Sequence, residues 1–296
     1  PLPLYGRGTT FEQQKQGEGW GRGVTRRSSN AIPMLVVALA AIALYFPAMI
    51  WLNASQAQKL LSRGAVLPCG DALSCAFNLR SPIIPAPNQI LEDIPRLYWP
   101  LTDPTTVPYN AFFTGLEALL GLLLGAIIGL GLAVLLTSSK AFERAVLPWL
   151  VASQTVPIIA IAPMLAVLLG ANGVQGLLPK VLISAYIAFF PIAIGVAKGF
   201  RSPDPLQLDL MRTYNASSIQ TFSSLRFPAS VPFLFTAFKI AMAAALIGAI
   251  VAESSTITDA GLGRMLSENS RASDARGLWL VMIGSAILGI ALVSLV

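Results

Sequence analysis

The chain has 296 residues, of which 55% are hydrophobic and 11% are charged, and its mean hydropathy is +0.69. Soluble domains carry about a quarter of their residues as charged side chains, so this composition predicts an integral membrane protein. The net charge of +6 comes from basic residues spread through loops with no aromatic stripe beside them, which favours contact with anionic lipid and argues against nucleic acid. The chain has no histidine and two cysteines, so a histidine-based catalytic triad is excluded and no metal site is expected.

Residues 1–30 are polar, glycine-rich and basic, and we predict a disordered cytoplasmic tail. The apolar run at 32–52 has about the 20 residues that a membrane span requires, which is longer than the apolar core of a signal peptide. Basic residues precede this run, so the positive-inside rule places the N-terminus in the cytoplasm. The chain starts at Pro1 and ends inside an apolar run at Val296, and we expect both ends to be trimmed.

Residues 53–110 are expected to form an outer segment. Cys69 and Cys75 lie six residues apart in this segment, with Gly70 and Asp71 between them. In an oxidising compartment they are a candidate disulfide, and two free thiols are the alternative. Neither arrangement makes these cysteines catalytic.

Five further spans are predicted, at 112–136, 145–169, 177–197, 233–251 and 277–296, which makes about six in an all-α membrane protein. Glycines at 121, 125 and 129 repeat every four residues in the second span, a spacing that lets a neighbouring helix approach closely. Glu117 lies one turn earlier on the same stripe. It is either a pathway residue, or a residue near the outer end that is wetted or paired with an arginine.

The third predicted span contains three prolines. Gln154 and Thr155 lie just before the middle proline, Pro157, and one valine separates them from it. Each proline frees a backbone carbonyl, which is tolerated at membrane depth only against protein or water. Such a helix either lines a transport pathway or is a kinked packing helix whose polar groups bond to its neighbours. The candidate pathway residues are therefore Glu117, Gln154, Thr155 and Pro157.

The polar segment 198–232 interrupts the apolar second half of the chain. Prolines at 203 and 205 predict that a short helix begins just after them, and Asn215 is expected to end it because asparagine tolerates the left-handed conformation. A second helix is expected with Ser217 or Ser218 as its N-cap, and Pro228 and Pro232 are expected to end that helix. The apolar stripe of this helix-turn-helix is too short to span a membrane, so we predict that it binds in a groove on a protein partner.

The same segment resembles the cytoplasmic loop of permease subunits from binding-protein-dependent ABC importers, which has the pattern Glu-Ala-Ala, three residues, Gly, nine residues, Ile-x-Leu-Pro. Here Asp209-Leu210-Met211 stands at the Glu-Ala-Ala and Asn215 at the glycine. Leu225-x-Phe227-Pro228 stands at the last motif with the spacing intact, and leucine and methionine replace the two alanines. A wider run from about Pro85 to Glu253 is similar to the nitrate, sulfonate, taurine and bicarbonate branch of these permeases.

The resemblance implies a type I ABC importer permease fold in a bacterial inner membrane, with a coupling loop at 198–232. It implies an ATPase dimer that binds ATP, a second permease copy that is most simply the same chain, and a periplasmic or lipid-anchored solute-binding protein. The residues to which it assigns coupling are Asp209, Leu210, Met211, Arg212, Asn215, Ala216, Leu225, Phe227 and Pro228.

The numbers of lysines and arginines in the short loops support a cytoplasmic location for the coupling loop. The inner set contains Lys140, Arg144 and four basic residues of the coupling loop, and the outer set contains Lys180 and three arginines at 264, 271 and 276. The chain lacks the GxxxxGK[ST] phosphate-binding pattern, so we expect no enzyme activity and no cofactor in this chain.

A secondary transporter or channel not coupled to ATP is the alternative function. Such a protein would use intramembrane charges, for which Glu117 and Lys239 are the candidates, and two repeated halves are not evident in the sequence. A membrane-embedded enzyme is disfavoured because the chain has no histidine and few carboxylates in its apolar runs.

Overall fold

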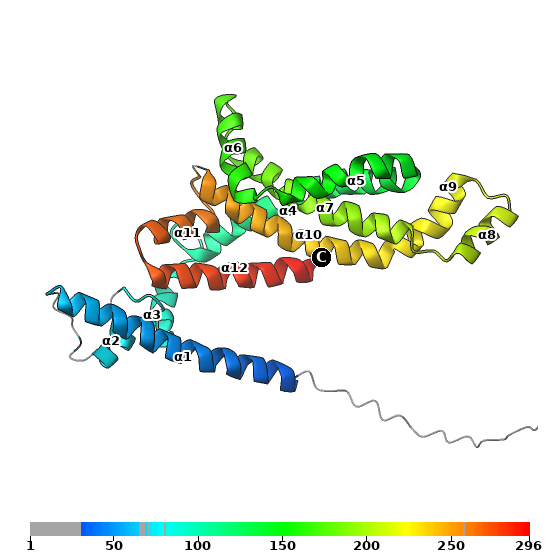
Figure 1. The fold of residues 1–296 in the computed structure, drawn as a ribbon. Helices are drawn as coiled ribbons and strands as arrows, with labels where there is room; N and C mark the ends of the chain where they lie inside the picture. The colour runs from blue at the N-terminus through cyan, green and yellow to red at the C-terminus, as the bar shows by residue number, and fades with distance from the viewer. Residues whose placement is uncertain (1–30, 65–68, 70–71, 80, 257) are drawn as a thin grey trace, which may run out of the picture. The chain divides into compact units, whose positions relative to one another are not determined.

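The computed structural model describes residues 31–64, 69, 72–79, 81–256 and 258–296 (Figure 1). The predicted tail at 1–30 lies outside these residues. Every regular element in the described ranges is a helix. The helices are α1 (Ala31–Ser62), α2 (Ala72–Asn78), α3 (Pro87–Tyr98), α4 (Val107–Ser138), α5 (Lys140–Thr155), α6 (Ile158–Ala171), α7 (Leu177–Phe200), α8 (Pro205–Thr213), α9 (Ser218–Thr221), the π-helix η1 (Phe222–Arg226), α10 (Phe227–Ser255), α11 (Leu262–Arg271) and α12 (Ala275–Leu295).

The chain divides into two compact units between Phe46 and Pro47. The described part of the first unit is the apolar first half of α1, whose large side chains are mostly exposed. The stretch Leu35–Ser62 is apolar and long enough to cross a membrane. This helix continues ten residues past the predicted end at 52, because the polar run that follows is rich in alanine, glutamine, lysine and leucine, which are strong helix formers.

The core of the second unit is formed by α4, α7 and α10, which pack closely through small residues. A Cβ atom added at Gly121 of α4 would lie 2.2 Å from the Cβ of Ser184 on α7, and one at Gly129 would lie 2.7 Å from a carbonyl oxygen of the same helix. On the other side of α7, a Cβ at Gly248 of α10 would lie 2.8 Å from the Cα of Ser184. The glycine stripe predicted for the second span is thus a helix contact, and its partner is α7.

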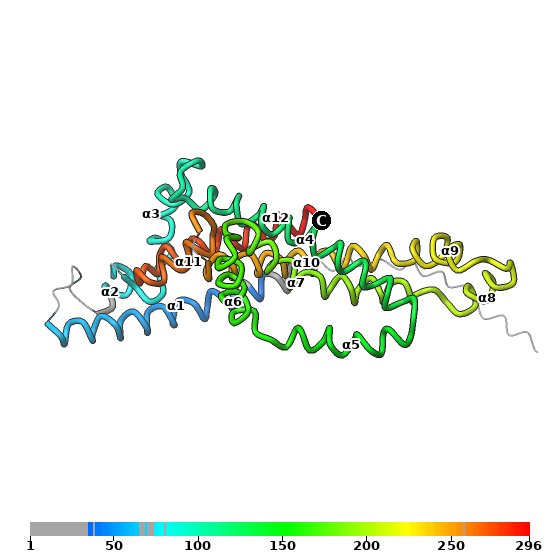
Figure 2. Tube along the Cα trace, turned by 90° about the horizontal axis from the view of Figure 1, so that it is seen from above, coloured from blue at the N-terminus to red at the C-terminus, as the bar shows by residue number. Residues whose placement is uncertain are grey.

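The helices α7 and α10 run side by side and have different structures at their two ends (Figures 1 and 2). The pair α8 and α9 lies between the C-terminus of α7 and the N-terminus of α10, and we call this the hairpin end. The helix α11 follows the C-terminus of α10 at the opposite end, which we call the α11 end. The helices α4 and α12 both begin near the α11 end, because Val107 at the start of α4 and Val281 in the second turn of α12 pack with Leu262 and Met265 of α11.

The third predicted span, 145–169, is not a single helix. It consists of α5 and α6, which meet at an angle of 93°. Val156 and Pro157 between them have extended backbone angles, because a proline disfavours the helical conformation of the residue before it. The predicted kink is therefore a full break.

Five described helical segments are long and apolar enough to cross a membrane, or six if the bent pair α5 and α6 forms one span. The fold is thus the all-α integral membrane fold that the composition predicted. The predicted spans at 112–136, 177–197 and 277–296 correspond to α4, α7 and α12 with longer bounds. The fifth span belongs to a continuous stretch, Ser218–Ser255, that includes the second helix of the hairpin.

The predicted outer segment folds around one asparagine of α1. The Asn53 amide nitrogen donates to the carbonyl oxygens of Ala76 and Ile84 at 2.9 and 2.8 Å, and its oxygen accepts from the Ile83 and Ile84 amides at 3.0 and 3.2 Å. Cys69 and Cys75 form a disulfide whose Cα atoms lie 5.1 Å apart. The second cysteine is buried against α1 with Ala57, so the segment has a small core of its own.

Candidate functional site

The hairpin begins with a capped helix, as its prolines predicted. The Asp204 side chain accepts from the Leu206 amide at 2.8 Å, and the Gln207 side chain accepts from the Asp204 amide at 3.1 Å. These reciprocal bonds form a capping box, and Pro205 occupies the first helical position, where its missing amide proton is not needed. Every contact of this cap lies within three residues of Asp204, so the sequence alone can specify it.

The turn between α8 and α9 is formed by Asn215, which has a φ angle of 52°. The Ala216 amide donates to the Met211 carbonyl at 3.0 Å, and the Asn215 amide donates to the Arg212 carbonyl at 2.9 Å. This pair of bonds is a Schellman motif, which requires a residue that tolerates the left-handed region. Asparagine therefore performs the conformational role of the glycine in the family pattern.

The second half of the hairpin differs from the expectation. Ser217 caps α9 as predicted, and its hydroxyl accepts from the Gln220 amide at 3.2 Å. The chain then continues through η1 directly into α10, and Pro228 lies in the first turn of α10 instead of ending a helix. The expectation that Pro228 and Pro232 end the second helix is therefore wrong. The chain changes from the π-helix η1 to the α-helix α10, and this change places Pro228 where its missing amide proton is not required.

The hairpin presents an apolar face to its surroundings. Leu206 and Leu210 of α8 and its C-cap residue Tyr214 lie four residues apart and are 77%, 55% and 77% exposed, and Ile219 of α9 is 81% exposed. Beside them, Arg212 donates to Asp209 at 2.9 Å in an exposed ion pair. The other predicted coupling residues are half-buried or exposed at the base of the hairpin: Leu225, Phe227 and Pro228.

The base of the hairpin is joined to the core by specific contacts. The Phe222 ring of η1 packs on the Phe200 ring at the end of α7, with centroids 4.9 Å apart. Arg201 donates to the Leu136 carbonyl of α4 at 2.6 Å and pairs with Glu143 of α5. The base of the hairpin thus packs on the end of α7, which is itself bonded to α4 and α5.

Three of the candidate pathway residues meet at the break between α5 and α6. Gln154, Thr155 and Pro157 line an open cavity of about 260 Å³ together with side chains of α7 and α10. One of these, Tyr186, donates its hydroxyl to the Ser153 carbonyl, which the break leaves without its usual helical partner. The structure thus places the polar groups of Gln154 and Thr155 in a cavity between the α5–α6 break, α7 and α10.

Glu117, the fourth candidate, is not part of that cavity. It is 2% exposed and forms an ion pair with Lys180 of α7, whose own exposure is 5%. The expectation that Lys180 is a charge of an outer loop is wrong, because Lys180 lies in the first turn of α7 and is buried. Glu253 in the last turn of α10 is also buried, with 1% of its surface exposed. The sequence does contain an indication of this burial, because Lys180 and Glu253 both lie inside or beside an apolar run.

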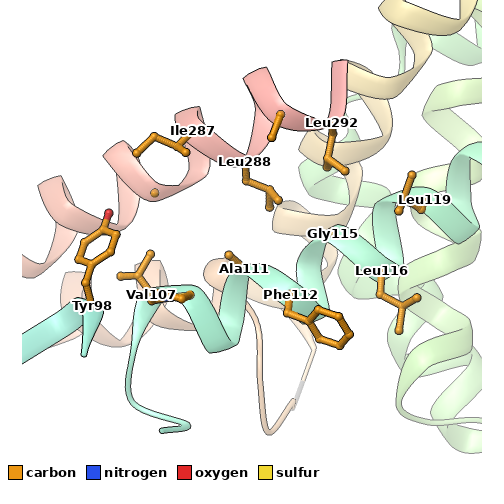
Figure 3. Close-up of a pocket in the computed structure, with 13 residues that line it drawn as sticks. Tyr98, Val107, Ala111, Phe112, Gly115, Leu116, Leu119, Ile287, Leu288 and Leu292 are labelled. Carbon is orange, nitrogen blue, oxygen red and sulfur yellow. The ribbon is translucent and has the colours of Figure 1, made fainter. Parts of the chain in front are cut away.

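A larger cavity, of about 490 Å³, lies between α4 and α12 (Figure 3). It is lined by apolar side chains from both helices, with Ala111, Gly115 and Leu119 on one wall and Leu288 and Leu292 on the other. Its polar boundary is Tyr98, whose hydroxyl is already bound to the Leu280 carbonyl at 2.9 Å. This groove lacks the groups that would recognise a polar solute.

A bundle of helices long enough to span a membrane, a cavity with polar side chains at a broken span, and a helical hairpin with an exposed apolar face together define a multi-pass transport permease. The chain belongs to the family described as "binding-protein-dependent transport system inner membrane component", whose sequence profile matches residues 121–296. The match covers α4 from Gly121 onward and all later helices, including the hairpin.

Individual relatives agree with this membership. A probable ABC transporter permease protein of Haemophilus influenzae is 34% identical over 199 residues, covering 66% of this chain and 76% of the relative. The formylaminopyrimidine transport permease protein ThiX of Halalkalibacterium halodurans is 34% identical over 186 residues, covering 61% and 72%. The nitrate import permease protein NrtB of a Synechocystis strain is 27% identical over 216 residues, covering 71% and 76%.

The resemblance to permease subunits of binding-protein-dependent ABC importers is thereby confirmed. The chain is a multi-pass membrane protein and a permease subunit of a binding-protein-dependent ABC transporter, and it is not itself an enzyme. Permeases of this family work with an ATPase and a solute-binding protein.

Proposed function

We propose that this permease imports a small solute through a path that passes the α5–α6 break, and that the α8–α9 hairpin couples it to a separate ATPase dimer. ATP would bind to that partner, and no cofactor would bind to this chain. The single observation that carries the coupling proposal is the apolar face of the hairpin. Exposed leucine, tyrosine and isoleucine side chains on an ordered helix pair indicate a protein partner with a complementary groove.

The charges around the hairpin support a cytoplasmic location for this end. Lys140 and Arg144 at the start of α5 and Lys198 and Arg201 at the end of α7 gather there with the basic residues of the hairpin. Basic residues are retained on the cytoplasmic side of membranes, and ATP is available there. The N-terminus is then also cytoplasmic, and the α11 end and the disulfide-bonded segment are on the outer side.

The polar side chains in the cavity at the α5–α6 break support a role for this cavity in the solute path. Gln154 offers both a donor and an acceptor and Thr155 a hydroxyl, at a depth where apolar side chains otherwise surround the helices. The path would form between this chain and a second copy, so each copy contributes one such cavity. Relatives named for nitrate and formylaminopyrimidine indicate a small polar solute as the class of substrate, delivered by a periplasmic or lipid-anchored binding protein.

The coupling proposal is tested by co-purification of the tagged chain with the ATPase expressed beside it. We expect the Asp209→Arg and Leu210→Asp double variant to lose the ATPase at least tenfold, because it reverses the charge and removes the apolar character of the α8 face. Leu101→Asp is the matched control, since Leu101 is also 55% exposed but lies far from the hairpin, between α3 and α4.

The result that contradicts the proposal is equal retention of the ATPase by the wild type, the hairpin variant and the control. Transport by the chain alone, driven by an ion gradient and indifferent to ATP, would instead support the secondary-transporter alternative. Thermal unfolding of each variant, compared with the wild type, shows whether loss of the ATPase reflects loss of the fold.

A further inference from the structure

Three buried charged side chains meet at the α11 end and are not explained by the solute path or by the hairpin. They are Glu117 of α4, Lys180 of α7 and Glu253 of α10, and we call them the three-charge cluster. Each is at most 5% exposed. Their formal charges sum to −1, and they come from the three helices that form the core of the permease.

Lys180 connects the cluster to the turn that leads into α11. Its ammonium group pairs with Glu117 and also donates to the Thr258 hydroxyl at 2.8 Å. The Thr258 hydroxyl in turn donates to the Ala260 carbonyl at 2.9 Å. The lysine is therefore shared between the core and residues 258–261, which we call the turn segment.

Glu253 connects the cluster to α11 itself. Its carboxylate accepts from the first turn of α11 and from the Thr114 hydroxyl of α4 at 2.7 Å, and this interaction suits the positive end of the helix dipole. A Cβ atom at Gly261 would lie 2.2 Å from the Glu253 carboxyl carbon, so the backbone rests directly on the carboxylate. Three successive amides are each bound by a side chain of α4 or α10: Gly261 by Asn110 at 2.7 Å, Leu262 by Thr114 at 2.9 Å and Gly263 by Glu253 at 2.7 Å.

On the side of the cluster away from α11, which we call below, α4, α7 and α10 pack closely. Gly121 and Gly248 both press on Ser184, one helical turn from Glu117 and Lys180. Access to the cluster is therefore closed from below by the helices and from above by the turn segment and α11. Two oxygens inside this enclosure, Glu117 Oε2 and Ser184 Oγ, have no hydrogen-bond partner.

Stability alone does not account for such a cluster. Replacing a buried ion pair by apolar groups of similar volume is often neutral or stabilising, because burial removes both charges from water. Apolar residues would thus hold the three helices at least as well. What the charges add is a set of directional bonds to the turn segment, and spare acceptor oxygens that can take up new donors when those bonds break.

We propose that Glu117, Lys180 and Glu253 are positioning residues of an outer gate, which hold the turn segment and α11 closed over the core and release them when the permease opens outward. This rests on the proposed importer function and orientation. In the closed state described here, the bonds to Thr258 and to the α11 amides are made. Outward opening breaks them.

The helix α10 supplies the mechanical connection between the gate and the hairpin. It runs as one helix from Phe227, beside the hairpin, to Ser255, and Glu253 lies in its last turn. At 1.5 Å per residue, Glu253 is roughly 39 Å from Phe227 along the axis. A rigid-body rotation of α10 that starts at the hairpin therefore displaces Glu253 relative to α4 and α11.

The test measures how readily a buried thiol below the gate reacts with an impermeant thiol reagent added to the outside of membrane vesicles that contain the full chain. Ser184→Cys places the thiol at a wholly buried position whose hydroxyl has no partner. The two native cysteines are joined in the disulfide, so they do not react. We expect slow labelling in this background and at least about tenfold faster labelling when Lys180→Met is added, which corresponds to about 1.4 kcal/mol in the opening equilibrium.

Two controls separate a gate from a general structural role. Lys180→Arg keeps the positive charge and is expected to keep labelling slow. Glu268→Gln removes the ion pair with Arg264 on α11 but leaves the Arg264 bond to the Asp259 carbonyl and the three-charge cluster in place, so it should leave the rate unchanged. If Lys180→Met does not accumulate in the membrane, Thr258→Val removes just the hydroxyl that accepts from Lys180 and is expected to accelerate labelling at least threefold.

The proposal is overturned if neither Lys180→Met nor Thr258→Val accelerates labelling. It is also overturned if Lys180→Arg accelerates labelling as much as Lys180→Met, or if labelling rises only in step with loss of thermal stability. Because the assay contains neither ATP nor an ATPase, these results do not depend on the coupling proposal. ATP-dependent acceleration in the assembled transporter would test that coupling separately.

Discussion

The contact between α4 and α7 predicts a large effect from the smallest substitution available. In Gly121→Ala, the new methyl group would lie 2.2 Å from the Ser184 Cβ and 3.2 Å from the Ala185 amide nitrogen. Carbon atoms pack at about 3.5–4.0 Å, so the two helices must separate by roughly 1.5 Å or shift along each other. Neither movement is free, because α10 presses on the same serine from the other side.

The expected loss of stability in Gly121→Ala is the difference between two opposed effects. Overpacking a well-packed core costs typically about 1–3 kcal/mol, and the clash with both side chain and backbone places Gly121 at the upper end, about 3 kcal/mol. Alanine regains about 1 kcal/mol of helix propensity over glycine, which leaves a net loss of about 2 kcal/mol. For a chain of this size, the unfolding midpoint should fall by about 4–8 °C.

The assay is thermal unfolding of the detergent-solubilised permease, followed by fluorescence of its five tryptophans. Gly131→Ala is the matched control on the same helix, because nothing lies within 4 Å of its new methyl group, and its midpoint should stay equal or rise. Adding Ser184→Gly to Gly121→Ala removes the clashing carbon and should recover about half of the loss. Equal midpoints for the Gly121 and Gly131 variants, or no recovery in the double variant, would refute the reasoning.

Three further predictions concern local structure. Asn215→Gly should preserve the hairpin and its binding to the ATPase. Asn215→Val should lower ATPase binding, because a β-branched residue in the left-handed conformation destabilises the turn by about 1–2 kcal/mol. Equal ATPase binding by both variants contradicts the assigned turn. Replacing Cys69 and Cys75 by serine should lower the free energy of unfolding by about 2 kcal/mol, because the disulfide closes a short loop and restricts the unfolded chain. An unchanged thermal unfolding midpoint after reduction of the wild-type disulfide would contradict this expectation. Asn53→Leu should cost about 2–4 kcal/mol because buried backbone groups lose their partners, whereas Gln56→Leu removes one exposed bond and should cost less than about 1 kcal/mol.

The sequence determined the parts of this protein that depend on neighbours in the chain. The cap at Asp204, the left-handed turn at Asn215 and the cap at Ser217 each involve residues within five positions, so their side chains specify them directly. The apolar length of the runs likewise determines which helices can span a membrane, because each span satisfies its own backbone hydrogen bonds. Family membership followed from the spacing of the hairpin motif.

For some features, the sequence predicted that a close contact or an irregular backbone occurs, but not the structure that results. The glycine stripe of α4 predicted a close helix contact, but not that Ser184 of α7 is the residue it meets. The prolines at 157 and 228 marked irregular backbone, yet the first breaks a span by 93° and the second begins a long helix. A proline removes one amide donor in either case, and the surrounding packing decides whether the chain bends or continues.

The tertiary structure alone decided which charges are buried together. Glu117 and Lys180 are 63 residues apart, and Thr114 and Glu253 are 139 apart, so no local pattern joins them. Whether a carboxylate near the end of an apolar run meets water, lipid or a lysine depends on which helices pack beside it. That choice belongs to the assembled core of α4, α7 and α10, where the close approach of small residues one turn away leaves the charges only each other and the start of α11.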